Sequence, residues 1–243
     1  MAAPVIRGPW GNFVFGRRPV LLFDADDTLW ECNVVFERAA DDFCAWQARP
    51  GLDAAAVRRV LAGIERANTE RHGAGAAVFL RSLADCLERL QQRPATGAEH
   101  AHLRRLAEAV LDCRIEMIPE VAETLGALQE KYPLVLVTKG DTVDQWRKID
   151  NSGLRGHFEA VHVVREKTTA TYSWLAERYQ LDVERTWMVG NSPASDILPA
   201  LAAGMGAVYV PNDNTWALEH ADLDSAADRL VTLERFGQLL DHF

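Results

Sequence analysis

The 243-residue chain contains no run of about 18 apolar residues, which is close to the minimum for a membrane-spanning helix. We therefore expect no membrane span. The first residues, MAAPVIRGPWGNFVFGRR, hold no continuous apolar segment of the kind found in secretory signal peptides. The four cysteines are scattered and form no Cys-x-x-Cys pair, which argues against structural zinc and against a disulfide framework. These absences favour a protein of the reducing cytoplasm.

Positive charge is also scarce. The chain has 26 Lys and Arg against 35 Asp and Glu, for a net charge of -9. Because nucleic-acid binding depends on clustered basic side chains, we expect no nucleic-acid partner. A small phosphorylated metabolite needs only local positive charge and a metal ion, so it stays compatible with an acidic chain. The 48% hydrophobic content is that of an ordinary globular protein.

The most informative segment is PVLLFDADDTLW, Pro19 to Trp30. Its short apolar run predicts a buried strand. Asp24, Asp26 and Thr28 follow that run at alternate positions. Open α/β sheets bind their ligands at the carboxyl ends of strands, so these groups are placed to hold a divalent cation and to attack a substrate. Taken alone, the segment also fits an acidic turn that caps a helix.

Helical periodicity dominates the next part of the chain. Four amphipathic helices and no strand are predicted, at 33–48, 53–72, 76–92 and 98–114. In the second of these, apolar residues recur at i, i+3, i+4 and i+7, positions that share one face of a helix. Breaks rich in proline or glycine separate the helices.

Strands and helices alternate after residue 118. We expect strands at 134–137, 161–164, 186–189 and 207–210, and helices at 119–131, 142–152, 169–179 and 195–203. This alternation predicts a parallel sheet with right-handed crossovers. The first predicted strand precedes the helical block, so the block is best explained as an insertion. We therefore expect an α/β, Rossmann-like core of residues 1–32 and 115–243 with an inserted four-helix domain of residues 33–114.

Polar residues follow the later strands as well. Thr138 comes directly after one apolar run, Lys167 starts a helix after the next, and GNSPASDI supplies Asn191 and Asp196 after a third. Together with Asp-x-Asp-x-Thr, this order of motifs resembles the haloacid dehalogenase superfamily. Most members of that superfamily are Mg-dependent phosphatases, and a helical cap that follows the first motif closes over the site.

The resemblance covers about residues 19–31 and 117–211, and it implies a mechanism. Asp24 is implied as the nucleophile that forms an aspartyl-phosphate, which divides one hard displacement into two easier ones. Asp26 is implied as the acid that protonates the leaving oxygen and then as the base that activates water.

The resemblance also implies the groups that hold the phosphate. Thr138 and Lys167 are expected to bind the remaining phosphoryl oxygens, because phosphoryl transfer depends on positioning and on charge neutralisation. The family usually has a Lys-Pro pair at this lysine, and here Thr replaces the proline. Lys139 and Arg165 are alternative candidates for the cation.

Magnesium is the implied cofactor. Its expected ligands are the carboxylate of Asp24, the backbone carbonyl of Asp26, Asn191 and Asp196. The family usually has Asp where this chain has Asn191, and a neutral amide oxygen attracts the ion less than a carboxylate does. The same position therefore leaves two possibilities open, a weaker metal site or a site without catalysis.

Other residues near the motifs receive supporting roles. Thr28 is expected to fix Asp26, and Thr28, Trp30 and Lys139 are expected to lie at the substrate. Trp30 equally fits core packing. Trp216 and His220 follow the last predicted strand and are candidates for the edge of the site.

Alternative functions on the same fold stay open. A haloacid dehalogenase needs no acid to release halide, so Asp26 favours phosphate. A phosphonatase uses a cap lysine, and residues 33–114 contain none, which argues against that activity. A phosphomutase, or a catalytically silent protein that binds a phosphorylated ligand, is also possible, the latter because of Asn191. The sequence indicates neither the substrate nor whether the protein is a monomer or a homodimer.

Overall fold

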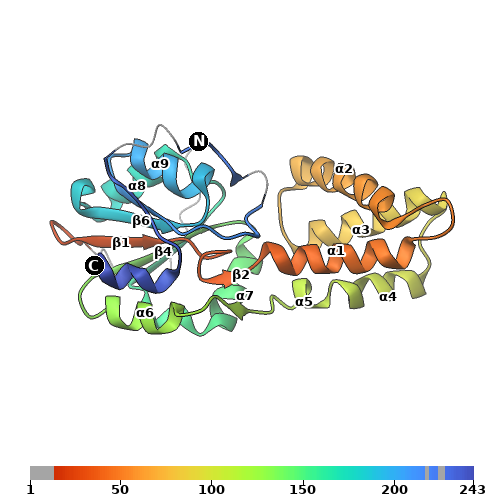
Figure 1. Ribbon diagram of the computed structural model, residues 1–243, viewed down its shortest axis with the longest axis horizontal. Coiled ribbons are helices and arrows are strands. Elements are labelled where there is room, and N and C mark those ends of the chain that lie inside the picture. The colour runs from red at the N-terminus through yellow and green to blue at the C-terminus, as the bar shows by residue number, and fades with distance from the viewer. Residues whose placement is uncertain (1–13, 217–218, 224–227) are drawn as a thin grey trace.

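The computed structural model describes residues 14–216, 219–223 and 228–243. The molecule has two lobes, a sheet with helices on both faces and a bundle of helices beside it (Figure 1). The strands are β1 Val20–Phe23, β2 Trp30–Glu31, β3 Glu116–Met117, β4 Leu134–Lys139, β5 Ala160–Val164, β6 Thr186–Gly190, β7 Gly206–Tyr209 and β8 Leu230–Thr232. The helices of the sheet lobe are α6 Val121–Leu128, α7 Thr142–Ser152, α8 Thr169–Tyr179 and α9 Leu198–Ala202.

Six strands of the described residues form one sheet in the order β5-β4-β1-β6-β7-β8, and every neighbouring pair is parallel. The strand β1 lies inside this sheet, where Phe23 pairs with Leu136 of β4 and with Val189 of β6. The carboxyl ends of these three strands therefore meet at one edge. The predicted α/β fold with a parallel sheet is confirmed.

Both faces of the sheet are buried, as a parallel sheet requires. Side chains of β1 alternate between the two faces. Leu21 and Phe23 pack with α6 and the short C-terminal helix Phe236–Asp241, and Leu22 packs with α8 and α9. Figure 1 shows α8 and α9 on one side of the sheet and α6 on the other. This double cover makes β1 a rigid support for the residues that follow it.

The helical unit consists of α1 Asn33–Gln47, α2 Ala54–His72, α3 Ala76–Gln91, α4 Gly97–Leu106 and α5 Glu108–Leu111. It has its own apolar core, in which Phe43, Leu61, Leu83 and Leu103 are fully buried. The chain enters this unit through β2 and leaves it through β3, and these two strands pair antiparallel. The helical unit is therefore joined to the sheet lobe by two adjacent strands.

The observed elements differ from the predicted ones in a few places. The helix predicted at 98–114 is two helices, α4 and α5, which break at Ala107. The helix predicted at 195–203 begins as a π-helical turn, Pro193–Ile197, before α9. The sequence did not indicate β2, β3 and β8, which are only two or three residues long and too short for a periodic pattern. No helix of the described residues has the length and apolar character needed to cross a membrane.

Candidate active site

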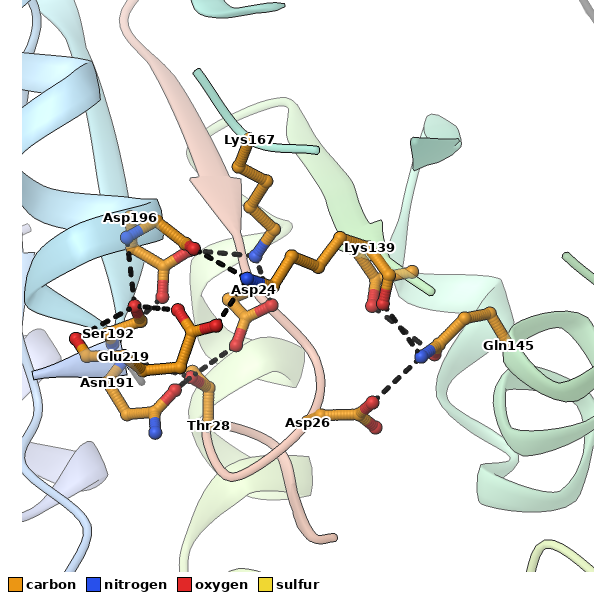
Figure 2. Close-up of polar contacts among 12 residues, drawn as sticks. Asp24, Asp26, Thr28, Lys139, Gln145, Lys167, Asn191, Ser192, Asp196 and Glu219 are labelled. Carbon is orange, nitrogen blue, oxygen red and sulfur yellow. Dashed lines mark hydrogen bonds and ion pairs between the residues drawn. The ribbon is translucent and has the colours of Figure 1, made fainter. Parts of the chain in front are cut away.

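Asp24 lies at the centre of the candidate site, directly after β1 (Figure 2). Its backbone N–H donates to the carbonyl of Val189 at 2.9 Å, which continues the pairing of β1 with β6. The residue is 5% exposed. One carboxylate oxygen accepts a hydrogen bond from Lys167 Nζ, and the other lies 2.9 Å from Thr28 Oγ1. The nucleophile predicted from the sequence is thus a fixed, nearly buried carboxylate.

Lys167 joins Asp24 to Asp196. Its Nζ lies 2.7 Å from Asp196 Oδ1 and also forms an ion pair with Asp24. Burial lowers the pKa of Lys167, but the charges of the two carboxylates outweigh burial and raise it. Burial and the charge of Asp24 raise the pKa of Asp196 to about 7, although Lys167 opposes the shift. With all three groups ionised, this buried cluster carries one net negative charge, which a bound cation would compensate.

Thr28 connects the first motif to the last one. Its Oγ1 accepts the backbone N–H of Asn191 at 3.0 Å and lies 3.1 Å from Asn191 Oδ1. The same hydroxyl lies 2.9 Å from Asp24 Oδ2, so the oxygens of Asp24 and Asn191 flank one atom. The structure places Thr28 against Asp24 and Asn191, not against Asp26 as predicted. The reason is the backbone turn at 24–28, which brings the side chain at i+4 back over residue i.

Asp26 points away from Asp24 toward α7 (Figure 2). Its Oδ2 accepts from Gln145 Nε2 at 2.8 Å and from Lys148 Nζ at 2.5 Å, and its Oδ1 accepts from Trp30 Nε1 at 2.8 Å. Burial raises the pKa of Asp26, but the charge of Lys148 and the three donors outweigh burial and lower it. In this arrangement Asp26 is a carboxylate anion.

Three residues hold Asp26, and the sequence-based assignment gave none of them this role. Trp30 is 1% exposed and holds Asp26, so it lies under the site instead of facing a substrate. Gln145 and Lys148 were not among the predicted site residues. Their spacing of three on the helix that follows Thr138 places them on one helical face. The helix predicted at 142–152 therefore already placed these two residues on one face, although it did not show that this face meets Asp26.

Thr138 and Lys139 end β4 at the same edge. Thr138 is 1% exposed, and its Oγ1 donates to Gln145 Oε1 at 3.3 Å. Lys139 Nζ donates to Ser195 Oγ at 2.7 Å and forms an ion pair with Glu219. Figure 2 shows the Lys139 side chain reaching across toward Asp24 and Glu219.

Glu219 is a further residue that sequence reasoning missed. Besides Lys139, its carboxylate accepts from Ser192 Oγ at 2.5 Å. Burial raises the pKa of Glu219, but these donors outweigh burial and lower it. Trp216 and His220, the predicted candidates for the edge of the site, flank Glu219 in the sequence. Trp216 is 38% exposed, and His220 Nε2 lies 3.2 Å from the carbonyl oxygen of Thr215. Nothing in the local sequence pattern separates Glu219 from other surface acids.

The oxygen atoms of this edge fit a magnesium ion. Asp24, Asn191 and Asp196 offer two carboxylates and one amide oxygen, the hard ligands that Mg²⁺ prefers. Thr28 Oγ1 lies within 3.1 Å of an oxygen from Asp24 and one from Asn191. Among the described residues no three His, Cys, Asp or Glu side chains gather closely enough to hold a metal. A third side-chain ligand would therefore be the amide of Asn191.

Comparison with known proteins places this geometry in a family. The family model for haloacid dehalogenase-like hydrolases matches residues 19–204. The 5-amino-6-(5-phospho-D-ribitylamino)uracil phosphatase YigB of Escherichia coli is 25% identical over 231 residues, which cover 87% of this chain and 94% of YigB. The glyceraldehyde 3-phosphate phosphatase of Methanothermobacter thermautotrophicus is 34% identical over 105 residues, 41% of this chain and 46% of that protein.

Solved structures agree with this placement. A haloacid dehalogenase-like family hydrolase from Xanthomonas campestris superimposes with a TM-score of 0.77 at 29% identity, covering 93% of this chain and 92% of that one. The L-2-haloacid dehalogenase of Xanthobacter autotrophicus shares the fold, with a TM-score of 0.60 at 17% identity over 91% of this chain and 96% of that one. The family model spans most of the chain and includes the ends of β1, β4, β5 and β6. The chain therefore belongs to the haloacid dehalogenase-like hydrolase family.

Proposed function

We propose that this protein is a Mg-dependent phosphatase that hydrolyses a small phosphomonoester through an aspartyl-phosphate on Asp24. The observation that carries the proposal is the pair of aspartates after β1. Asp24 is fixed between Lys167 and Thr28, and Asp26 stands two residues further along. The two curated relatives are named as phosphatases of phosphorylated small molecules, which supports the same class of substrate here.

The residues divide the reaction into two displacements. A carboxylate oxygen of Asp24 attacks phosphorus, the bond from phosphorus to the leaving oxygen breaks, and Asp26 gives that oxygen a proton. Asp26 then takes a proton from water, the water oxygen attacks phosphorus, and the bond to Asp24 breaks to release phosphate. Since Lys148 holds Asp26 as an anion, Asp26 has to take up a proton and leave Lys148 before the first step.

The surrounding cations hold the transferred group. In this proposal Lys167 and Thr138 bind phosphoryl oxygens, and Lys139 adds a second ammonium at the same edge. Asp24, Asn191, Asp196 and the backbone carbonyl of Asp26 would hold Mg²⁺. When bound, the ion supplies positive charge that offsets the repulsion between the carboxylates and the phosphate.

The helical unit is proposed as the cap of this site, with the core of residues 1–32 and 115–243 and the cap of residues 33–114. It contacts α7, the helix that holds Asp26. Asp144 Oδ2 accepts the backbone N–H of Ala76 at 2.9 Å, and Arg147 Nη1 donates to the carbonyl of Leu111 at 3.3 Å. A cap anchored there would exclude water and contact the leaving group.

The four cysteines are free thiols, which supports a reducing cytoplasmic location.

A dehalogenase is the second candidate, since the fold is shared with 2-haloacid dehalogenases. Asp26 favours phosphate, because a halide leaves without a proton whereas an alkoxide needs one. A silent binding protein is the third candidate. It rests on Asn191, which brings one negative charge fewer to the metal than an aspartate.

The test compares wild type with Asp24→Asn on p-nitrophenyl phosphate and a panel of phosphomonoesters, with and without Mg²⁺. A second arm supplies 2-haloacids and measures halide release. We expect Mg-dependent phosphate release that falls by about 10³-fold or more in Asp24→Asn, because the nucleophile is lost. The matched control is Asp150→Asn, which removes an exposed carboxylate of α7. Absence of phosphate release by wild type, or equal release by Asp24→Asn, would contradict the proposal.

A further inference from the structure

The amide of Asn191 is held by one specific neighbour, Thr215. Asn191 Nδ2 donates to Thr215 Oγ1 at 2.7 Å, and Thr215 Oγ1 donates to the backbone carbonyl of Asn212 at 2.8 Å. A hydroxyl group has only one proton to give. Since that proton goes to Asn212, the hydroxyl can only accept from Asn191. The nitrogen of the amide therefore faces Thr215, and its oxygen faces Thr28.

Thr215 is itself fixed in place. It is 6% exposed, and its backbone N–H donates to the carbonyl of Asn212 at 3.0 Å. Asn212 Nδ2 donates to the carbonyl of Asp27 at 3.1 Å, and Asn214 N donates to Asn212 Oδ1 at 2.7 Å. Asn33 Nδ2 donates to the carbonyl of Asn214 at 2.8 Å. The 212–215 loop is thus tied both to the turn after β1 and to the start of α1.

We propose that Thr215 is a positioning residue that fixes the carbonyl oxygen of Asn191 in the orientation needed to bind Mg²⁺. The inference rests on the proposed function, because it takes Asn191 as a metal ligand. Were the amide turned over, its NH₂ group would face the cation, and the oxygen ligand would be lost. A carboxylate has no such preferred orientation, because its two oxygens are equivalent. The chain therefore pairs an amide at 191 with an acceptor at 215.

The experiment measures Mg²⁺ binding by isothermal titration calorimetry on the full chain without substrate. Thr215→Val removes the hydroxyl at almost constant shape, and Thr215→Ser retains it as the matched control. We expect the dissociation constant of Mg²⁺ to rise about five- to tenfold in Thr215→Val, the effect of one lost hydrogen bond. We expect Thr215→Ser to stay within about twofold of wild type.

Asn191→Asp provides the decisive background. With a carboxylate at 191 the orientation no longer matters, so adding Thr215→Val should change the dissociation constant by less than about twofold. An equal rise in both backgrounds would overturn the inference, and so would an unchanged constant in Thr215→Val. If wild type hydrolyses phosphomonoesters with Mg²⁺ while Thr215→Val binds the ion normally, this inference fails and the proposed function stands. If wild type neither binds Mg²⁺ nor hydrolyses any phosphomonoester, both fail.

A second measurement needs no folded Thr215 variant. The side-chain NH₂ of Asn191 is identified by ¹⁵N NMR as the resonance that disappears in Asn191→Asp. We expect its hydrogens to exchange slowly in wild type, because one of them is donated to Thr215 in a buried position. Rapid exchange, at the rate of an exposed asparagine, would overturn the inference.

Discussion

Lys148 offers the sharpest test of how Asp26 is held. Its Nζ lies 2.5 Å from Asp26 Oδ2, and the two side chains are 13% and 23% exposed. Removing one partner of a buried ion pair costs about 3–5 kcal/mol, because the other charge is left uncompensated. Asp26 would keep its hydrogen bonds from Gln145 and Trp30 and is partly exposed, which reduces the cost. We therefore expect Lys148→Met to lower the free energy of unfolding by about 2 kcal/mol.

The assay is urea unfolding followed by tryptophan fluorescence, with a thermal scan beside it. A loss of about 2 kcal/mol corresponds to a fall in Tm of about 4–8 °C for a chain of this size. The control is the same substitution in an Asp26→Asn background, where no charge is left uncompensated. There we expect Lys148→Met to cost less than about 0.5 kcal/mol.

Two results would refute this reasoning. One is a Lys148→Met protein as stable as wild type, which would mean that the pair contributes nothing. The other is an equal loss in both backgrounds. In that case the aliphatic stem of Lys148, or its Nζ contact with Cys32 Sγ at 3.5 Å, would carry the effect instead of the charge of Asp26.

Two further predictions concern pH and packing. Burial, helped by the charge of Arg178, lowers the pKa of His162 from 6.5 to about 4. Between about pH 6.5 and pH 4, His162 therefore stays neutral in the folded protein but takes up a proton in the unfolded chain. The free energy of unfolding accordingly decreases as the pH is lowered through this window, by about 2 kcal/mol at pH 5. His162→Gln should lack this pH-dependent loss of stability, which is measured by urea unfolding at pH 7.5 and at pH 5. An unchanged pH dependence in the variant would contradict the lowered pKa of His162. A Cβ at Gly190 would lie 2.7 Å from Asp196 Cβ and closer still to its carboxyl group, so Gly190→Ala should cost at least about 2 kcal/mol and most of the activity. The control Gly126→Ala, in α6 with nothing within 4 Å, should instead raise stability by about 0.5–1 kcal/mol, and a neutral Gly190→Ala would refute the packing argument.

The sequence predicts the strand-end residues of the candidate site for a simple physical reason. Each follows a short apolar run or opens the helix after one, and buried parallel strands align their carboxyl ends. Asp24, Thr138 and Asn191 therefore come together once β1, β4 and β6 are paired in the observed register. Lys167 and Asp196 lie a few residues further on and still reach the same cluster.

The residues that the sequence did not reveal depend on rotations and distant contacts. Lys148 faces Asp26 because of how α7 is turned about its own axis, which the apolar pattern of that helix sets only loosely. Glu219 reaches Lys139 from a segment without periodicity, across 80 positions of sequence. Thr215 matters only through the direction of one proton, and no local pattern encodes that direction. Propensity and periodicity describe single elements, whereas these contacts belong to the packed whole.

The paired strands β2 and β3 have a consequence for how such a protein can evolve. Trp30 lies opposite Met117 and Glu31 opposite Glu116, so the two crossing points of the chain are neighbours. The entropy of closing a loop grows only slowly with its length, and here the ends are already held together. An insertion of another size or shape at this stem would leave the spacing of its ends, and hence the sheet, untouched. The chemistry of the sheet edge and the choice of molecule that reaches it can therefore diverge independently.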